Sequence, residues 1–457
     1  MHPFANKRMT IFGLGRTGQA AARYLHGQGA IILVTESGDT PALQEQATAL
    51  RGEGIAVELG GHSARVLDSD VIVLSPGVPT NLPILEQARD LGVRISSELE
   101  VVWRDRGVPI YAVTGTNGKT TVTALLHHVL TTAGQRSVLC GNNDLPLSEA
   151  LRTLPKPDCY VLEVSSYQLE STYTFRPQVA AVLNVTPDHP RHGTLQQYAA
   201  VKNRILGFQA AGDVSVLNAD DPIVSDMAIA DGVEVLTFST KGKPDAAVRV
   251  EAGMVTFKGE AILPQADIPL PGKHNLANVL AVVAMACAAG VPAAEVAHGI
   301  RSFRGVPHRI EPVRTLGGVT YYNDSKSTNI DSLRVALESF TQPVVLIAGG
   351  RGKGAGYGTL EALVRKHVRA LVLIGEDGPK MAAAWGHAVP SLTATSMEEA
   401  VQLAADAADP GDAVLLSPGC ASFDWYNNFE ERGEDFRACV NALEEATPFK
   451  EELLNGA

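Results

Sequence analysis

Apolar and polar residues follow a repeated pattern along the chain. Short runs rich in Val, Ile and Leu alternate with segments in which apolar residues recur every three or four positions. The runs include MTIFG, AIILVTE, DVIVLSPG, IYAVTG, CYVLEVS, VAAVLNV, VSVLNAD, PVVLIAGG, ALVLIGE and AVLLSPG. Apolar strands separated by helices are typical of parallel sheets covered on both faces, so the pattern predicts an α/β protein throughout. Shorter strand-like pieces between about residues 238 and 271 predict antiparallel strands there.

Two polar segments divide this pattern. RDRGVP (residues 104–109) precedes a new apolar run, and FRGVPHRIEPV (residues 303–313) lies between a helical stretch and the next run. A chain of 457 residues also exceeds one ordinary core, since domains average about 150 residues. We therefore expect three domains, at residues 1–107, 108–306 and 307–457.

Composition narrows the functional classes. The formal charge of −12 argues against broad electrostatic binding of nucleic acid. No run of about 18 apolar residues and no basic segment followed by an apolar one occurs, so we expect no membrane span, no secretory signal and a cytoplasmic location. The cysteines form no CxxC pair and predict reduced thiols rather than disulfides or zinc ligands: Cys140, Cys159, Cys287, Cys420 and Cys439.

The first apolar run leads into a glycine-rich turn. Gly13, Gly15 and Gly18 have GxGxxG spacing before an Ala-rich helical segment. Glu36 ends the second run, where a dinucleotide-binding fold places an acid that holds a ribose. Taken alone, these residues suggest a nicotinamide-dependent oxidoreductase. The motif is weak, because other diphosphate ligands and tight helix–strand packing require the same glycines.

A second glycine-rich turn carries a more specific signal. VTGTNGKTTVTALLHHVL (residues 113–130) follows an apolar run and opens a helix. Its backbone N–H groups and helix start would attract phosphate, Lys119 would meet phosphate oxygens, and the Thr120 hydroxyl could ligate magnesium. The general GxxxxGK[ST] pattern lacks its first glycine here. The turn nevertheless favours a triphosphate-dependent ligase or kinase over a dehydrogenase.

Three ionisable residues follow this turn. Glu163 lies at the carboxyl end of an apolar run, where magnesium beside a triphosphate would balance the carboxylate. His189 follows the next run and is either a ligand or an ordinary loop histidine. Lys202 shares a helix face with Leu195 and Tyr198. From spacing alone, the preferred interpretation of Lys202 is a stem that covers apolar surface, and the alternative is a buried neutral amine that forms a carbamate with carbon dioxide.

Segments spread along the whole chain resemble the Mur ligase family of bacterial cell-wall synthesis. In order, they are TGTNGKTT, EVSSYQLE, NVTPDH, the helix with Lys202, NADDP, GKHNLAN, PHRIE, NDSKSTN and SPGCASFDWYNNFEERG. DSKSTN and the last segment, with the N-terminal GLGRTG and SPGVP, are similar to the members that add D-glutamate. The sequence has no DNPR-type motif, which a member that adds a diamino acid would be expected to carry.

The resemblance implies both a fold and a reaction. The fold has a Rossmann-like N-terminal domain for a UDP-linked substrate, a central P-loop ATPase-like domain with a mostly parallel sheet, and a Rossmann-like C-terminal domain for D-glutamate. The implied reaction is ATP-dependent amide formation, in which the carboxylate of UDP-N-acetylmuramoyl-L-alanine attacks the γ-phosphate and D-glutamate attacks the acyl phosphate. Two Mg²⁺ sites and a carbamylated Lys202 are implied as well. We expect a monomer.

The family pattern also implies roles for single residues. It implies catalytic roles for Lys119, Glu163, His189 and Lys202, and metal binding by Thr120, Glu163, His189 and carbamylated Lys202. It implies ATP binding by Gly115, Thr116, Asn117, Gly118, Lys119, Thr120, Thr121, Asn275, Asn278, His308, Arg309 and Asp324. It implies binding of the UDP-linked substrate by Gly15, Arg16, Thr17, Glu36, Ser75, Gly77 and Asn142. It implies D-glutamate binding by Lys326, Thr328, Lys353, Ser422 and Phe429.

Two segments depart from the family pattern. DHPRHG (residues 188–193) is one residue shorter than the usual DHxDRH-like run and lacks its second Asp, which leaves the reach of His189 to a metal open. GNNDLP (residues 141–146) replaces a GNIG-like turn, which leaves the contact of Asn142 open. The alternatives are a family member with another amino acid substrate, a nicotinamide-dependent oxidoreductase, and an ATP-binding scaffold without turnover.

Overall fold

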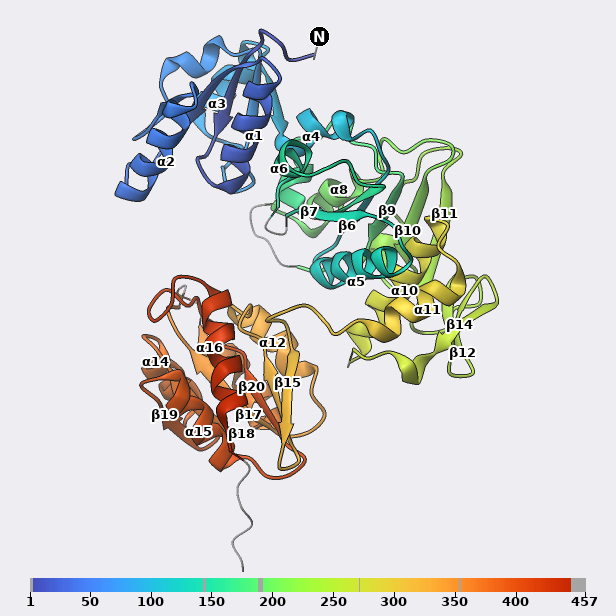
Figure 1. Cartoon of the computed structure of the whole chain (residues 1–457), viewed down its shortest axis with the longest axis vertical. Coiled ribbons are helices and arrows are strands. Elements are labelled where there is room, and N and C mark those ends of the chain that lie inside the picture. Colours follow the sequence, from blue (N-terminus) through green and yellow to red (C-terminus); the bar gives the residue numbers. More distant parts are fainter. Residues whose placement is uncertain are drawn as a thin grey trace, which may run out of the picture. The chain divides into compact units, whose positions relative to one another are not determined.

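The computed structural model of the chain describes residues 3–142, 145–187, 192–270, 272–352, 354 and 356–444. Within these ranges Figure 1 shows sheets with helices packed on them, coloured from blue through green and yellow to red along the chain. The alternation of strands and helices confirms the α/β fold class predicted from the apolar pattern. No helix in the described ranges is long and apolar enough to cross a membrane.

The chain divides into two compact units. Unit 1 comprises residues 1–269 and 273–303, and unit 2 comprises residues 270–272 and 304–457. The described strands form two sheets in unit 1 and one sheet in unit 2. The largest buried cluster of unit 1 extends through both of its sheets, so these pack as one body.

The N-terminal sheet of unit 1 is parallel, with the described strands in the order β3-β2-β1-β4-β5. Its elements are β1 (Arg8–Phe12), α1 (Arg16–Gly27), β2 (Ile31–Thr35), α2 (Pro41–Gly52), β3 (Ala56–Glu58), β4 (Val71–Leu74), α3 (Pro83–Asp90), β5 (Arg94–Ser97) and α4 (Glu98–Val102). The chain order reverses between β1 and β4. Ligands of open parallel sheets bind outside the carboxyl ends of the strands at such a point, where GLGRTG and SPGVP follow β1 and β4.

The second sheet of unit 1 has the order β14-β13-β12-β11-β10-β9-β6-β8-β7. Its elements are β6 (Ile110–Thr114), α5 (Lys119–Thr132), β7 (Ser137–Gly141), α6 (Leu147–Thr153), β8 (Cys159–Glu163), α7 (Ser166–Leu169), β9 (Val179–Val182), α8 (Leu195–Asn203), β10 (Val214–Asn218), α9 (Pro222–Ser225), β11 (Glu234–Ser239), β12 (Val248–Glu251), β13 (Met254–Phe257), β14 (Glu260–Pro264), α10 (Lys273–Ala288) and α11 (Ala293–Ser302). The sheet is parallel from β7 to β12 and antiparallel from β12 to β14. This confirms the antiparallel strands predicted between residues 238 and 271.

Buried carboxylates connect the two sheets of unit 1. Glu98 Oε1 accepts a hydrogen bond of 2.7 Å from the Ser148 backbone N–H, at the start of α6. Glu100 Oε2 accepts bonds of 2.9 and 3.0 Å from the backbone N–H groups of Tyr173 and Thr174. Both glutamates belong to α4, which follows the last strand of the first sheet. Helix α4 therefore fixes the first sheet to the loops of the second.

Unit 2 contains a third sheet, with the described strands in the order β15-β16-β20-β17-β18-β19. Its elements are β15 (Glu311–Leu316), β16 (Val319–Asn323), α12 (Ile330–Glu338), β17 (Val344–Gly349), α13 (Glu361–His367), β18 (Val368–Ile374), α14 (Gly378–Trp385), β19 (Ser391–Thr393), α15 (Met397–Ala407), β20 (Ala413–Leu416) and α16 (Phe429–Ala442). Strand β15 is antiparallel to β16, and the other pairs are parallel. Hydrophobic clusters cover both faces of this sheet.

Candidate active site

The predicted phosphate-binding turn lies between β6 and α5. Residues 115–121, here called the GKT loop, follow the end of β6, and α5 begins at Lys119. Gly115 and Gly118 have φ angles of +155° and +87°, which residues with a side chain rarely adopt. A Cβ on Gly118 would also clash with the side-chain oxygen of Asn278, from α10. Glycine at 118 therefore lets the loop turn directly against α10.

Two lysine side chains converge on one carbonyl of the GKT loop. The carbonyl oxygen of Gly115 accepts hydrogen bonds from Lys119 Nζ at 3.0 Å and from Lys202 Nζ at 2.8 Å. Lys119 Nζ also donates to the Thr116 carbonyl at 2.8 Å. The Nζ atoms of two lysines, one from α5 and one from α8, thus lie beside the loop, and Lys202 is 87 residues from the Gly115 carbonyl that it binds.

Lys202 is enclosed by the protein. The residue is 1% exposed, and its Nζ lies 4.4 Å from the centroid of the Tyr198 ring. The interpretation preferred from spacing alone, a lysine that keeps its ammonium in water, is therefore wrong, because the face it shares with Tyr198 packs inward against the GKT loop. The buried amine is the alternative that the spacing left open.

Glu163 has one satisfied and one unsatisfied carboxylate oxygen. It is the last residue of β8, is 4% exposed and pairs in register with Val113 of β6. Its Oε1 accepts a 2.9 Å hydrogen bond from Asn142 Nδ2, whereas its buried Oε2 has no hydrogen-bond partner among the described residues. A buried carboxylate oxygen without a hydrogen bond destabilises the folded protein unless a cation binds to it.

Residues of α10 and of the loop after β9 border the GKT loop on other sides. Asn278 Nδ2 donates to Asn275 Oδ1 at 3.1 Å, and both residues are buried. The Thr116 backbone N–H donates to the Asn184 carbonyl at 2.9 Å, and the Asn117 backbone N–H donates to Asn184 Oδ1 at 2.8 Å. Thr120 and Thr121 are half-buried in the first turn of α5. The structure thus brings the central ATP-binding candidates together around one loop.

A buried histidine that stacks on Tyr198 escaped the sequence analysis. His192 Nε2 lies 2.9 Å from Ser166 Oγ, and its Nδ1 lies 3.1 Å from Glu170 Oε1. The ring also stacks on Tyr167 and Tyr198, with centroid distances of 5.3 and 5.1 Å. In the sequence His192 is one polar residue in a polar loop, and only its partners reveal that it joins α7 to α8. His189, the predicted ligand, lies outside the described residues.

The glycines of the first turn have separate functions. Gly13 has a φ of +94°, and a Cβ on Gly18 would clash with the Gly13 carbonyl oxygen, so both serve the tight strand–helix turn. A Cβ on Gly15 would meet no atom within 4 Å. The buried Oγ of Ser75, after β4, has no hydrogen-bond partner within the described ranges. Gly15 and Ser75 therefore leave room and an unused polar group at the point where the strand order reverses.

The other residues of unit 1 predicted to bind the UDP-linked substrate include exposed ones and one that bonds within the protein. Arg16 and Thr17 are the first two residues of α1, and exposed Gly77 lies in the loop after β4. Glu36 Oε2 accepts a 3.0 Å hydrogen bond from the Leu14 backbone N–H. Burial raises the pKa of Glu36, but bonds from backbone N–H groups outweigh it and place the pKa below its usual value. Glu36 is therefore a carboxylate that ties the glycine-rich turn to β2.

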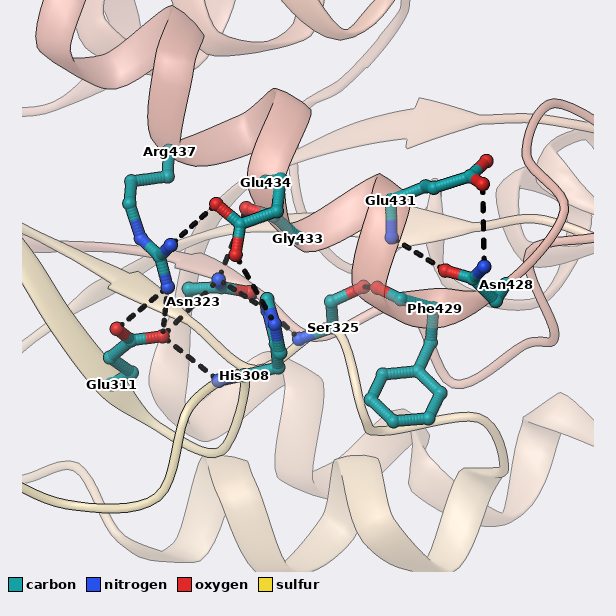
Figure 2. Close-up of polar contacts among 10 residues, drawn as sticks. All are labelled: His308, Glu311, Asn323, Ser325, Asn428, Phe429, Glu431, Gly433, Glu434 and Arg437. Atoms are coloured by element: carbon teal, nitrogen blue, oxygen red, sulfur yellow. Dashed lines mark hydrogen bonds and ion pairs between the residues drawn. The ribbon is translucent and has the colours of Figure 1, made fainter. Parts of the chain in front are cut away.

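In unit 2, His308 lies at the centre of a polar network (Figure 2). Its Nδ1 lies 3.0 Å from Asn323 Nδ2, and its backbone N–H donates to Glu311 Oε2 at 2.8 Å. A Cβ on Gly433 of α16 would clash with the imidazole, which explains a glycine within that helix. Burial lowers the pKa of His308. The PHRIE and NFEERG segments, distant in sequence, thus form one contact around His308.

Asp324 is buried at the end of β16. Its Oδ2 accepts a 2.7 Å hydrogen bond from Ser417 Oγ, and its Oδ1 accepts a 3.2 Å bond from the Ile310 backbone N–H. Burial raises the pKa of Asp324 to about 6, although nearby Arg309 and these bonds oppose the change. Asp324 and Arg309 are therefore close in unit 2, as their common predicted role requires.

Asp324 should make the stability of unit 2 depend on pH. Since burial raises its pKa to about 6 from 3.8, its contribution is greatest below about pH 4 and is lost as pH rises through 6. The difference amounts to about 3 kcal/mol. We expect Asp324→Asn to remove this decline in urea unfolding between pH 4.5 and 7.5. Equal slopes of unfolding free energy against pH in the wild type and the variant would contradict this.

The described residues predicted to bind the amino acid come from three parts of unit 2. Lys326 Nζ lies 5.3 Å from the centroid of the Phe429 ring, and the Lys326 backbone N–H donates to the His308 carbonyl at 3.0 Å. Thr328 is half-buried in the same loop as Lys326. Ser422 is 2% exposed in the loop after β20. Lys353, the remaining candidate, lies outside the described residues.

The arrangement can neutralise and orient anions in two places. Unit 1 presents a glycine loop, two lysines and a buried carboxylate with an unused oxygen, which together suit a nucleotide triphosphate and a divalent cation. Unit 2 presents a lysine, an aromatic ring and a buried serine at the carboxyl edge of its sheet, which suit a small anionic ligand.

The cysteines are free thiols, as predicted.

Family models match three successive parts of the chain. The Mur ligase MurD-like N-terminal domain matches residues 7–97, the Mur ligase middle domain matches residues 113–286, and the Mur ligase glutamate ligase domain matches residues 308–420. Together these matches cover most of the chain.

Curated relatives match the chain over nearly its whole length. The UDP-N-acetylmuramoylalanine–D-glutamate ligase of Salinibacter ruber is 42% identical over 452 residues, which is 95% of this chain and 98% of the relative. The protein of the same name from Acidobacterium capsulatum is 41% identical over 444 residues, covering 95% of this chain and 96% of the relative.

Solved structures share the fold of the chain. UDP-N-acetylmuramate-alanine ligase MurC from Thermotoga maritima superimposes with a TM-score of 0.59 at 20% identity, covering 95% of this chain and 99% of that one. MurF from Acinetobacter baumannii gives a TM-score of 0.59 at 18% identity over 82% of this chain and 87% of its own. Because the fold is shared and relatives above 40% identity span nearly the full length, the chain belongs to the Mur ligase family.

Proposed function

We propose that the chain adds D-glutamate to UDP-N-acetylmuramoyl-L-alanine, with hydrolysis of ATP, in the synthesis of peptidoglycan precursors. The observation that carries the proposal is near full-length identity of 40–42% to curated ligases of that name. The GKT loop with its two lysines supports an ATP-dependent reaction. A nicotinamide-dependent reaction would have no use for this loop or for the buried Glu163.

The proposed chemistry proceeds in two steps. An oxygen of the alanyl carboxylate attacks the γ-phosphorus of ATP, the bond to the bridging oxygen breaks, and ADP leaves. The amine of D-glutamate then attacks the acyl carbon, loses a proton and expels phosphate to leave an amide. The first step builds negative charge on phosphoryl oxygens, and the second builds it on the acyl oxygen and the leaving phosphate, so the enzyme must supply positive charge and orientation. Lys119 and the first turn of α5 would do so from the GKT loop.

Mur ligases use ATP and Mg²⁺, and the residues present fit a magnesium ion. The observation that fits a magnesium ion is the buried Glu163 Oε2, which has no hydrogen-bond partner within the described residues. Thr120 is the second residue of α5, in the GKT loop. We propose that Glu163 and Thr120 hold one ion, and that His189 with a carbamylated Lys202 holds a second. When bound, magnesium would neutralise charge on the phosphates. Lys202 has the burial that carbamylation needs.

Further residue assignments complete the proposal. The UDP-linked substrate would lie on Gly15, Arg16, Thr17, Glu36, Ser75, Gly77 and Asn142. The GKT loop would hold the phosphates of ATP through Gly115, Thr116, Asn117, Gly118, Lys119, Thr120 and Thr121, and the nucleotide would also meet Asn275, Asn278, His308, Arg309 and Asp324. D-glutamate would meet Lys326, Thr328, Lys353, Ser422 and Phe429. We further propose three domains at residues 1–107, 108–306 and 307–457, with the whole acting as a cytoplasmic monomer.

The open space at Gly15 allows a test of the UDP-substrate site. Because a Cβ at Gly15 meets nothing within 4 Å, Gly15→Val should leave the melting temperature unchanged but obstruct a diphosphate. We expect a rise of about tenfold or more in KM for the UDP-linked substrate and little change in KM for ATP. Gly18→Ala is the contrasting variant, since its Cβ clashes with Gly13 and should destabilise unit 1 by about 2 kcal/mol. An unchanged KM in Gly15→Val would place the substrate elsewhere.

A substrate panel tests the proposed function directly. Phosphate release from ATP is measured with UDP-N-acetylmuramoyl-L-alanine and, in turn, D-glutamate, L-glutamate, L-lysine or diaminopimelate. The proposal predicts release that requires both the UDP-linked substrate and D-glutamate. Turnover with another amino acid and none with D-glutamate would move the chain to a different specificity within the family. Binding of NADH without any ATP-dependent turnover would favour the oxidoreductase alternative.

A further inference from the structure

Arg432 is a buried arginine in the first turns of α16. The residue is 1% exposed, and its guanidinium donates only to neutral groups in the hydrogen bonds that the described residues make with it. Nε donates to Ser325 Oγ at 2.9 Å and Nη2 to the Ser325 carbonyl at 2.8 Å. Nη1 and Nη2 each donate to the Cys420 carbonyl at 3.1 Å. One side chain thus joins the loop after β16 to the loop after β20.

A third loop meets the same guanidinium. Gly350 follows β17 with a φ of +129°, and a Cβ built there would lie 3.2 Å from Arg432 Nη1. The next residue, Arg351, exchanges backbone hydrogen bonds of 2.9 and 3.0 Å with Ala421. Because β16, β20 and β17 are neighbours in the sheet, Arg432 lies where three carboxyl-terminal loops converge.

These loops carry residues proposed to bind D-glutamate. Lys326 follows Ser325 directly, and Ser422 lies two residues after Cys420. Small changes in loop position would therefore move the groups that recognise the amino acid. We infer that Arg432 is a positioning residue that sets the D-glutamate pocket by holding three loops in register. The inference rests on the proposed function, because it takes D-glutamate as the ligand of unit 2.

The energetics agree with a positioning role. Burial lowers the pKa of Arg432 to about 10, so the side chain stays cationic at neutral pH despite the lost hydration. The carboxylates of Asp424 and Asp324 lie near enough to stabilise this charge. A buried arginine is still a costly way to attach a helix, since apolar side chains of similar size would do so as well or better. The planar fork of arginine, by contrast, can bond several carbonyls at fixed angles, which lysine cannot.

Arg314 provides a matched control. It also donates to main-chain carbonyls of α16 and the residues after it, with distances of 3.4, 3.1 and 2.9 Å to Val440, Asn441 and Leu443. It lies on β15, and these three bonds lead to the far end of α16 rather than to the loops that Arg432 joins. Arg314→Met should therefore loosen α16 without disturbing the proposed pocket.

The test compares Arg432→Met, Arg432→Lys and Arg314→Met in full-length protein. We expect KM for D-glutamate to rise about 30-fold or more in Arg432→Met and less in Arg432→Lys, with KM for ATP and for the UDP-linked substrate changed less than twofold. Arg314→Met should lower the melting temperature with less than a twofold change in any KM. An unchanged KM for D-glutamate in Arg432→Met, or an equal rise in Arg314→Met, would overturn the inference.

Arg432→Ala with added methylguanidinium gives a second readout. The ion can occupy the cavity and restore the hydrogen bonds, so it should lower KM for D-glutamate toward the wild-type value, whereas methylammonium should not. Equal effects of both ions would also overturn the positioning role. If the wild type shows no D-glutamate-dependent phosphate release, the proposed function fails. If the wild type shows this release and the Arg432 variants have the same KM for D-glutamate, the role of Arg432 fails and the proposed function stands.

Discussion

Replacement of Lys202 by alanine is expected to lower kcat about 1,000-fold or more. The side chain is buried, and its Nζ lies 2.8 Å from the Gly115 carbonyl oxygen in the GKT loop. Its loss removes either a metal-binding carbamate or a cation beside the phosphates, and each contributes charge stabilisation where charge develops. Steady-state phosphate release measures the effect, and Lys202→Met, which retains the apolar stem, controls for the packing of α8.

Chemical rescue separates the two explanations for Lys202. If a carbamate acts at this position, acetate or propionate should restore part of the activity of Lys202→Ala, and sodium chloride at the same ionic strength should not. If the amine itself acts, methylamine should restore activity and the acids should have no effect. Full activity of Lys202→Ala without additives would contradict any catalytic role for this residue.

Replacement of Glu163 by glutamine is expected to have the second largest effect. Glutamine can keep a contact with Asn142, but it removes the anionic Oε2 that has no hydrogen-bond partner within the described residues. We expect kcat to fall about 100- to 1,000-fold and the Mg²⁺ concentration for half-maximal activity to rise, because a carboxylate ligand is lost. Without Mg²⁺, the variant should unfold at a temperature equal to or above the wild type, since a buried charge has been removed.

Glu98 supplies the matched control for Glu163. It is equally buried in unit 1, but burial raises its pKa and its Oε1 already accepts the Ser148 backbone N–H. Glu98→Gln should therefore change neither kcat nor the Mg²⁺ dependence by more than about threefold. A wild-type kcat for Glu163→Gln at saturating Mg²⁺, or the same loss in Glu98→Gln, would contradict a metal-binding role for Glu163.

Local patterns predicted much of the fold. The apolar runs indicated the parallel strands, and the glycine-rich turn 113–130 indicated the strand, loop and helix that the structure contains. The spacing also placed Lys202 on one helix face with Tyr198, and that face packs inward, although the buried amine was not the preferred interpretation. These features depend on residues a few positions apart, so the sequence carries them directly.

Features that join distant segments could not be read in the same way. The convergence of Lys119 and Lys202 on one carbonyl depends on the order of strands in the sheet, because Lys202 lies 87 residues beyond Gly115. His192 and Arg432 look like ordinary polar residues in a loop and a charged helix, and only their buried partners reveal them. Asn142 was predicted to meet the substrate, and the structure adds that its side chain binds Glu163.

Transfer of oxygen tests the proposed acyl phosphate most directly. UDP-N-acetylmuramoyl-L-alanine labelled with ¹⁸O in its free carboxylate is incubated with ATP, Mg²⁺ and D-glutamate, and the phosphate is analysed by mass spectrometry. The carboxylate oxygen that attacks the γ-phosphorus stays on phosphate when the amine displaces it. The account predicts one ¹⁸O transferred to phosphate per amide formed from fully labelled substrate. Unlabelled phosphate released in step with amide formation would contradict it.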